Sequence, residues 1–342
     1  MKSFYIAACG KDDRAGIYLG YLEDGAYRQQ AFYRQNCASY LAFSEDRRTL
    51  FAILEGSDFG GLASYSVAED GTLSKRSEFL TPGDGYCHLA VAPGGRYVYA
   101  ANYMGGTLVR FSVSGDAITG MEVMAKHTGC GPVADRQEAP HIHYTIVTPD
   151  RRFLCTVDLG IDCIDAYPFT SDGDIDVSKA IRSRILPAGS GPRHFIFAAD
   201  GRTVYLLNEL ANTVMVLDFD DGVFTIRQTL PTLWAVDNAG FSKASAIRLS
   251  PDGRFLFASN RGYDSIAVFN VGSDGLLSPH GLVKVPGSFP RDFNFLPEGD
   301  YILAGCELTN DAFLYHFNAS SGELLLDGGL ISLIPRPICI LW

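Results

Sequence analysis

Apolar and polar positions alternate along much of the chain in short runs that are separated by turn residues. Residues 107–113, 213–219 and 265–271 alternate with a period of two. This is the period of a β-strand that buries one face. No stretch shows helical spacing over the length of an ordinary helix, so we predict an all-β protein.

A larger pattern repeats along the chain: an apolar strand, a turn resembling Pro-Asp-Gly-Arg, and a second strand that ends in a polar residue. The turns end at residues 48, 96, 152, 202, 254 and 300, so successive copies are 46 to 56 residues apart. Pro presets φ in such turns, Asp hydrogen-bonds to the backbone, and Gly adopts positive φ. Several strands in each copy of this length are typical of a β-propeller.

The two ends of the chain account for a further unit. Residues 4–9, 16–22 and 338–342 are predicted strands, and pairing of the last with the first two completes a seventh blade. We therefore predict one domain over residues 1–342. It is a seven-bladed β-propeller with four-stranded antiparallel blades, whose last blade is closed by the N- and C-terminal strands. The longest irregular stretch is predicted from about Val123 to Ala139.

Composition limits the classes of partner. The chain has 342 residues, 47% hydrophobic and 20% charged, with a formal net charge of −11. This charge argues against a nucleic-acid or anionic-membrane surface. No apolar run has transmembrane length, and none of the eight cysteines forms a Cys-x-x-Cys pair. We expect a cytoplasmic protein whose cysteines are reduced core thiols.

Residues that differ between the copies are candidates for function. Aligned on the turn, the positions eight and nine residues before it, and six and seven after it, lie at one end of adjacent strands, because a hairpin returns to its starting level. We expect convergence on one rim of His143, Asp158, Arg193, Glu209, Arg261 and Arg291. Arginine forks bind carboxylate or phosphate, and a neutral histidine accepts a proton near pH 7.

Several alternatives remain open for these residues. His141 and His143 share one strand face, so either is a candidate base; as metal ligands they need a third partner, for which Asp158 or Glu209 is available. Each histidine also fits a hydrogen-bonding role in the channel lining. Arg193 and Arg261 also fit a structural salt bridge with Glu209. Glu209 shares its repeat position with Glu55 and Glu307, so its carboxylate is partly a repeat feature. No role is assigned to His127, His280 and His316.

Six short motifs occur in order along the chain. They are Pro140–His143, Asp158–Asp162, Gly191–His194, Asn208–Leu210, Ser259–Gly262 and Phe289–Phe293. This set resembles the seven-bladed propeller lactonases, which include bacterial propeller-type 6-phosphogluconolactonases and fungal carboxymuconate lactonising enzymes. The resemblance implies a site in the central channel without metal or cofactor. It assigns catalytic roles to His143 or His141, Arg193, Arg261 and Glu209.

The sixth copy departs from the family pattern. Cys306-Glu307 stands where an Asn-Gln-like pair is commoner, and Asp292 stands where Gly or His is commoner. These departures bear on the substrate more than on the fold.

The resulting hypothesis is hydrolysis of the lactone of an acidic sugar, with 6-phosphogluconolactone as the first choice. Substrate-binding roles are predicted for Asp158, His194, Asn260 and Arg291. A lactonising cycloisomerase of a carboxylated muconate is an alternative, because it needs the same anion clamp and proton donor. A non-enzymatic propeller that binds a peptide or protein is another. The expected partner is a small anionic lactone, and the expected assembly is a monomer or homodimer.

Overall fold

The computed structural model describes residues 3–10, 12–23, 25–83, 85–234, 236, 240–297 and 299–342. Glu298, one residue of the sixth predicted turn, lies outside them. The chain divides into two compact units. The first comprises Met1–Cys37, His194–Leu217 and Ile226–Trp342, and the second comprises Ala38–Arg193 and Asp218–Thr225.

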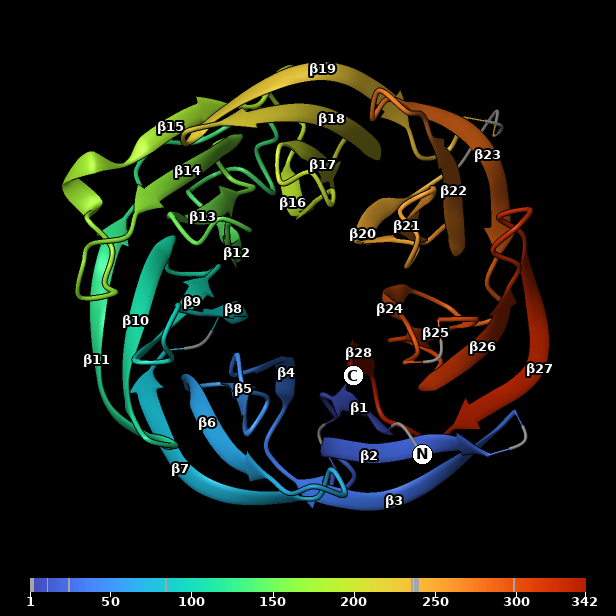
Figure 1. Ribbon diagram of the computed structural model, residues 1–342, viewed down its shortest axis with the longest axis horizontal. Coiled ribbons are helices and arrows are strands. Elements are labelled where there is room, and N and C mark those ends of the chain that lie inside the picture. Colours follow the sequence, from blue (N-terminus) through green and yellow to red (C-terminus); the bar gives the residue numbers. More distant parts are fainter. Residues whose placement is uncertain are drawn as a thin grey trace. The chain divides into compact units, whose positions relative to one another are not determined.

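The second unit contains three complete four-stranded antiparallel sheets, in each of which the strands follow one another in chain order (Figure 1). The first sheet is β4 (Ala38–Phe43), β5 (Thr49–Glu55), β6 (Phe59–Val67) and β7 (Leu73–Pro82). The next is β8 (Tyr86–Val91), β9 (Tyr97–Asn102), β10 (Thr107–Ser114) and β11 (Ala117–Lys126). The third is β12 (Ile142–Val147), β13 (Phe153–Asp158), β14 (Cys163–Pro168) and β15 (Ile181–Arg184).

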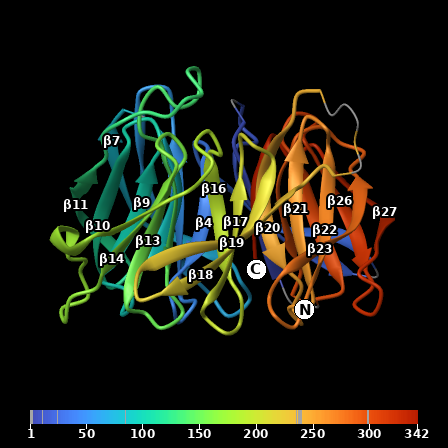
Figure 2. The same ribbon diagram turned by 90° about the horizontal axis from the view of Figure 1, so that it is seen from above.

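The first unit also contains three complete sheets. Two follow chain order: β20 (Lys243–Leu249), β21 (Phe255–Arg261), β22 (Ser265–Val271) and β23 (Leu277–Lys284), then β24 (Pro290–Phe295), β25 (Tyr301–Cys306), β26 (Asp311–Phe317) and β27 (Leu324–Ser332). Their strands lie next to each other in Figure 2. Phe257, Phe295 and Phe317 are buried in their shared core.

The remaining sheet of the first unit joins the two chain ends. Its order is β28 (Pro337–Leu341), β1 (Ser3–Ala8), β2 (Gly16–Glu23) and β3 (Ala26–Arg34). Ile6 pairs with Ile340 across the antiparallel β1–β28 ladder. A seventh sheet, β16 (Pro192–Phe197), β17 (Thr203–Asn208), β18 (Thr213–Asp220) and β19 (Val223–Pro231), has strands in both units. The prediction of seven four-stranded sheets, one closed by both termini, is confirmed.

Four of the six predicted turns are built around one aspartate each. The side chains of Asp46, Asp150, Asp200 and Asp252 accept a hydrogen bond from the backbone N–H two residues on, at 2.8 to 3.1 Å. Gly201 and Gly253 adopt positive φ in two of these turns. Because the turn geometry is local, the sequence was sufficient to predict it.

One predicted boundary differs from expectation, and one short element was not predicted. β11 extends to Lys126, so the irregular stretch before β12 begins later than Val123. A three-residue 3₁₀ helix, Val177–Lys179, is capped at its N-terminus by Asp176, whose side chain accepts a hydrogen bond from the Ser178 N–H. Both features lie in the connections, where burial patterns constrain the chain least.

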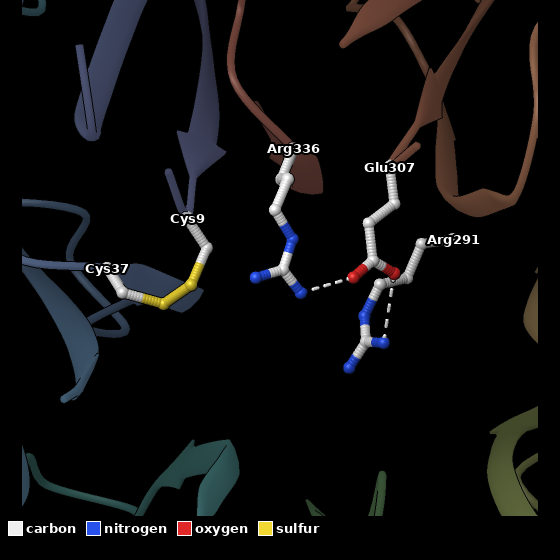
Figure 3. The surroundings of a disulfide bond; sticks show 5 residues. All are labelled: Cys9, Cys37, Arg291, Glu307 and Arg336. Atoms are coloured by element: carbon white, nitrogen blue, oxygen red, sulfur yellow. Dashed lines mark hydrogen bonds and ion pairs between the residues drawn. A yellow bond between two sulfur atoms is a disulfide. The ribbon is translucent and has the colours of Figure 1, made fainter. Parts of the chain in front are cut away.

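The expectation that every cysteine is a reduced core thiol is wrong for three of them: Cys130 is exposed, and two others are oxidised. Cys9 and Cys37 form a disulfide (Figure 3). They follow β1 and β3. The last residues of these two strands, Ala8 and Arg34, both pair with Gly16 of β2, so the two strands finish at the same end of their sheet. This proximity depends on strand order and leaves no local sequence signal. The free thiols are buried at Cys155, Cys163, Cys306 and Cys339, half-buried at Cys87 and exposed at Cys130.

Candidate active site

His141 is fixed by the end of the neighbouring strand. It stands directly before β12, and its backbone N–H donates to Asp158 Oδ1 at 2.8 Å. Its carbonyl oxygen accepts from the Leu159 N–H at 2.9 Å. The backbone that leads into β12 is therefore attached on both sides to the segment that follows β13.

Tyr103, which follows β9, contacts both candidate histidines. Its ring stacks on His141, with centroids 4.3 Å apart and planes 14° apart. It meets His143 edge-on, with centroids 5.4 Å apart. His141 Nδ1 donates to the Tyr103 carbonyl at 2.9 Å, and Nε2 lies 3.1 Å from Glu138 Oε1. Both ring nitrogens of His141 thus face oxygen acceptors.

Asp158 is the centre of a buried hydrogen-bond network. Besides the His141 N–H, its Oδ1 accepts from the N–H groups of Gly160 and Ile161, and its Oδ2 lies 2.7 Å from His127 Nδ1. The side chain of Asp158 is completely buried. Both carboxylate oxygens are therefore engaged by the protein, which is the arrangement of a residue that positions its neighbours.

His127 lies between two aspartates. Its Nε2 is 2.9 Å from Asp165 Oδ2 and 3.0 Å from the Tyr167 hydroxyl. Burial alone would lower the pKa of His127, but the hydrogen bonds to Asp158 and Asp165 raise that pKa above its ordinary value. Burial would likewise raise the pKa of Asp165, but hydrogen bonds from Arg182 and His127 hold it at about 2. The groups of this network are thus linked to one another by hydrogen bonds and ion pairs.

One group of side chains in this network has ligand atoms close enough for a metal ion. Donor atoms of His127, Cys163 and Asp165 lie within 4.8 Å of one another. Arg182 already forms two hydrogen bonds with Asp165, at 2.7 and 2.5 Å. A fixed guanidinium beside the carboxylate supplies the positive charge there, so we interpret the cluster as an ion-pair network.

The first unit contains a buried arginine–glutamate pair. Arg261, the last residue of β21, lies 2.7 Å from Glu209 Oε2, which follows β17. Arg261 also donates to the carbonyl oxygens of Lys243 and Ala244. Burial lowers the pKa of Arg261, and the charge of Glu209 opposes that effect. The Arg261–Glu209 contact that the salt-bridge alternative requires is present, whereas its structural role and the pairing of Arg193 with Glu209 stay predictions.

A second, more exposed cluster lies near this pair. Glu307 Oε2 is 3.2 Å from Arg291 Nη1, and Glu307 Oε1 accepts from Arg336 Nη2 (Figure 3). Burial would raise the pKa of Glu307, but the charge of Arg291, together with the hydrogen bond and charge of Arg336, lowers it below its ordinary value. The charge of Arg291 also depresses the pKa of Arg261, so the two clusters interact electrostatically.

The other predicted site residues are buried. Arg193 and His194 lie in β16 and are 3% and 6% exposed. The Asn260 side chain accepts from the Thr232 hydroxyl and donates to Ser265 Oγ. The departure at Asp292 is structural: its carboxylate binds Arg248 at 2.8 Å and the Ile340 N–H of the closing strand at 2.8 Å. Cys306 is also buried, which raises its pKa to about 12.

The predicted site residues fall in both units. His141, His143, Asp158 and Arg193 belong to the second, whereas His194, Glu209, Asn260, Arg261 and Arg291 belong to the first. Tyr103 and Asp158 bring the histidines together, and Glu209 orders Arg261. Convergence of the histidines and arginines on a single rim stays a prediction.

Sequence reasoning missed several residues of these clusters, among them Tyr103, Glu138, His127 and Arg336. Tyr103 was visible as one of the aligned positions after the turns, but an aromatic residue carried no obvious chemistry. Glu138 and His127 lie in the irregular approach to His141. Arg336 precedes β28, outside the repeated copies, so the alignment had no position for it. The signal that could have identified Arg336 is its charge, next to the predicted strand at the C-terminal end of the chain.

In the part of the chain that the structure describes, no helix is long and apolar enough to cross a membrane.

Comparison with known proteins shows which sequences and structures the chain resembles. The chain is 34% identical over 307 residues to the 6-phosphogluconolactonase of Bacillus subtilis, covering 88% of this chain and 86% of that protein.

Solved structures agree with this comparison. The periplasmic gluconolactonase of Pseudomonas aeruginosa has a TM-score of 0.89 and 27% identity, covering 99% of this chain and 98% of that one. A protein from Lactobacillus plantarum has a TM-score of 0.89 and 31% identity, covering 99% and 98%. The family model described as lactonase, seven-bladed β-propeller, matches residues 3–342. The seven sheets are the blades of such a propeller, and the chain is an enzyme that belongs to the seven-bladed β-propeller lactonase family.

Proposed function

We propose that the enzyme hydrolyses the lactone of an acidic sugar, with 6-phosphogluconolactone as the preferred substrate. Family membership supports lactone hydrolysis. The observation that carries the choice of an acidic substrate is the cluster of Arg261, Arg291 and Arg336 around only two carboxylates, in a protein whose formal net charge is −11. A local excess of guanidinium groups in an acidic protein is suited to an anionic ligand.

His143 is proposed as the general base. His141 is less suited to this role, because its Nδ1 donates to the Tyr103 carbonyl and its Nε2 faces Glu138. A base must offer a nitrogen lone pair to the attacking water. In the proposed reaction the water oxygen attacks the lactone carbonyl carbon while His143 takes a proton from that water.

Arg193 and Arg261 are proposed to stabilise the negative charge that develops on the carbonyl oxygen. Loss of one such donor typically costs about 3 kcal/mol of transition-state stabilisation. Glu209 fixes Arg261 through the 2.7 Å contact. When the bond from the carbonyl carbon to the ring oxygen breaks, protonated His143 returns the proton to that oxygen. The product is the open-chain hydroxy acid.

The buried residues are proposed to position the reacting groups. Asp158 holds the His141 backbone and Asn260 holds the end of β21. His194, beside Arg193 in β16, is kept as a candidate substrate contact. We further propose a cytoplasmic monomer or homodimer.

The test is the rate of acid release from freshly prepared 6-phosphogluconolactone, corrected for spontaneous hydrolysis. We expect enzyme-dependent hydrolysis and, in a parallel assay, no cyclisation of carboxymuconate. Turnover of carboxymuconate alone would instead assign the clusters to a lactonising reaction, because the same arginines can bind carboxylates. Absence of lactone hydrolysis at any enzyme concentration would refute the proposed substrate.

A further inference from the structure

Two arginines from different parts of the chain share one buried carboxylate. Arg291 is the second residue of β24, and Arg336 lies directly before β28, the strand that closes the sheet of the chain ends. Glu307 uses one oxygen for each guanidinium and its side chain is only 6% exposed. The Arg291 and Arg336 side chains are 30% and 44% exposed. Their charged ends are thus anchored on one side by Glu307 and accessible to solvent on another.

The neighbouring Arg261 is different in this respect. Its side chain is 6% exposed, and it is engaged by Glu209 and by two backbone carbonyls. A guanidinium that is enclosed by protein acceptors has little capacity for the bulky, strongly hydrated end of a substrate. Each guanidinium carries five N–H groups in a planar fork, and the side chains of Arg291 and Arg336 are more accessible to a ligand than that of Arg261 because they are more exposed.

The backbone of Arg336 is held in place despite its position in a connection. Its N–H donates to Asn310 Oδ1 at 2.9 Å, and its carbonyl oxygen accepts from the Cys9 N–H at 3.2 Å. Cys9 is in turn linked to Cys37, and Figure 3 shows the Arg336 side chain between this disulfide and Glu307. Arg336 therefore extends from a fixed backbone position, which reduces the ordering that ligand binding would require.

The net charge of the surrounding side chains determines which ligands the Arg291–Arg336 pair can bind. Arg261, Arg291 and Arg336 supply three positive charges, and Glu209 and Glu307 supply two negative ones, so the five side chains carry one net positive charge. Removing the charge of Glu307 would raise this to two. Because Glu307 is buried and in contact with both guanidiniums, its charge acts on them with little solvent screening.

We propose that Arg291 and Arg336 bind the anionic group of the substrate, and that Glu307 is the residue that sets how much negative charge this pair favours. The ligand chemistry is a phosphate or carboxylate remote from the lactone carbonyl. The inference rests on the proposed function and extends it by separating an outer anion-binding pair from the buried Arg261–Glu209 pair.

The experiment compares two lactones that differ in one phosphate: 6-phosphogluconolactone and glucono-δ-lactone. Arg336→Gln should raise KM for the phosphorylated lactone about tenfold or more, as expected for loss of a charge-assisted hydrogen bond, and leave glucono-δ-lactone hydrolysis almost unchanged. Glu307→Gln should act in the opposite direction and lower KM for the phosphorylated lactone severalfold. Arg254→Gln is the matched control, since Arg254 is an exposed turn arginine of the same unit.

Equal effects of Arg336→Gln on both lactones, or no effect on either, would overturn the proposal. So would a higher KM for the phosphorylated lactone in a folded Glu307→Gln variant, because that result is expected of a purely structural carboxylate. The thermal midpoint of each variant shows whether it is folded. If Glu307→Gln does not fold, Arg336→Lys decides the matter: retained charge without the fork should raise KM for the phosphorylated lactone less than Arg336→Gln does.

A binding measurement keeps the inference independent of turnover. Inorganic phosphate and acetate are titrated calorimetrically into the wild-type protein and the Arg336→Gln variant. Phosphate binding that is weakened at least tenfold in the variant supports the proposal even if neither lactone is hydrolysed, in which case only the proposed function fails. Tighter binding of acetate than of phosphate identifies a carboxylate as the natural anion. Undetectable binding of both ions, or equal binding by both proteins, overturns the proposal.

Discussion

The histidine region of the second unit and the arginine region of the first use buried charge in opposite ways. Around His141, charged and polar groups satisfy one another: Asp158 alone accepts three backbone N–H groups and contacts His127. Around Glu307, one buried carboxylate holds two arginines that remain partly exposed. A saturated network positions a neighbour, whereas a partly exposed one keeps donors within reach of a ligand.

The contrast between the two regions predicts that the loss of His143 has a large effect on activity, although most of the groups around the histidines are structural. His143→Gln should lower kcat/KM by about 100- to 10,000-fold, the usual contribution of a general base, while the thermal midpoint changes little. His141→Gln should cost less activity and more stability, because it removes the ring contacts to Tyr103 and Glu138. Steady-state kinetics and thermal unfolding of both variants test this. The reverse ranking would make His141 the base.

Breaking the buried pair of the first unit should mainly affect stability. Arg261→Met leaves Glu209 buried without its cation and should lower the free energy of unfolding by about 3–5 kcal/mol. The double variant Arg261→Met/Glu209→Leu removes both charges and should recover most of that loss, since a buried pair and an apolar replacement are often similar in stability. Both variants should lack activity. Urea denaturation measures the energies, and a double variant no more stable than the single one would contradict the interpretation.

The sequence was most informative where structure is local or repeated. Four of the turns depend on an aspartate and its neighbours, and seven sheets follow from six visible copies plus the chain ends. The repeat alignment also located Arg261, Arg291 and Glu307, because equivalent positions on hairpins lie at equivalent levels. Arg336 and the Cys9–Cys37 disulfide were missed. Both depend on which strands meet at the closure of the chain ends, and nothing in neighbouring residues indicates that contact.

The smallest expected effect concerns the pH dependence of the His127 network. Asp165 has a pKa held at about 2, below its ordinary 3.8, so its stabilising contribution is present above about pH 3.8 and is lost as pH falls toward 2. This contribution is about 2 kcal/mol. His127 has a raised pKa, so its contribution is complete below its ordinary value of 6.5 and is lost as pH rises through the higher folded value.

The two contributions together predict maximum stability from this network between about pH 4 and pH 6.5. The free energy of unfolding is measured from pH 2 to pH 9 for the wild type, His127→Gln and the control His280→Gln, which changes an exposed histidine. The difference between wild type and His127→Gln should be largest near pH 5 and shrink above pH 6.5, and the control variant shows the effect of removing a histidine outside the network. A difference for His127→Gln that is constant from pH 5 to pH 9 would show that the pKa of His127 is the same in the folded and the unfolded protein, because only a difference in bound protons makes stability depend on pH. A difference that grows as pH rises through 6.5 would show that His127 is neutral in the folded protein. Either result would contradict a charged His127 as the stabilising partner of Asp158 and Asp165.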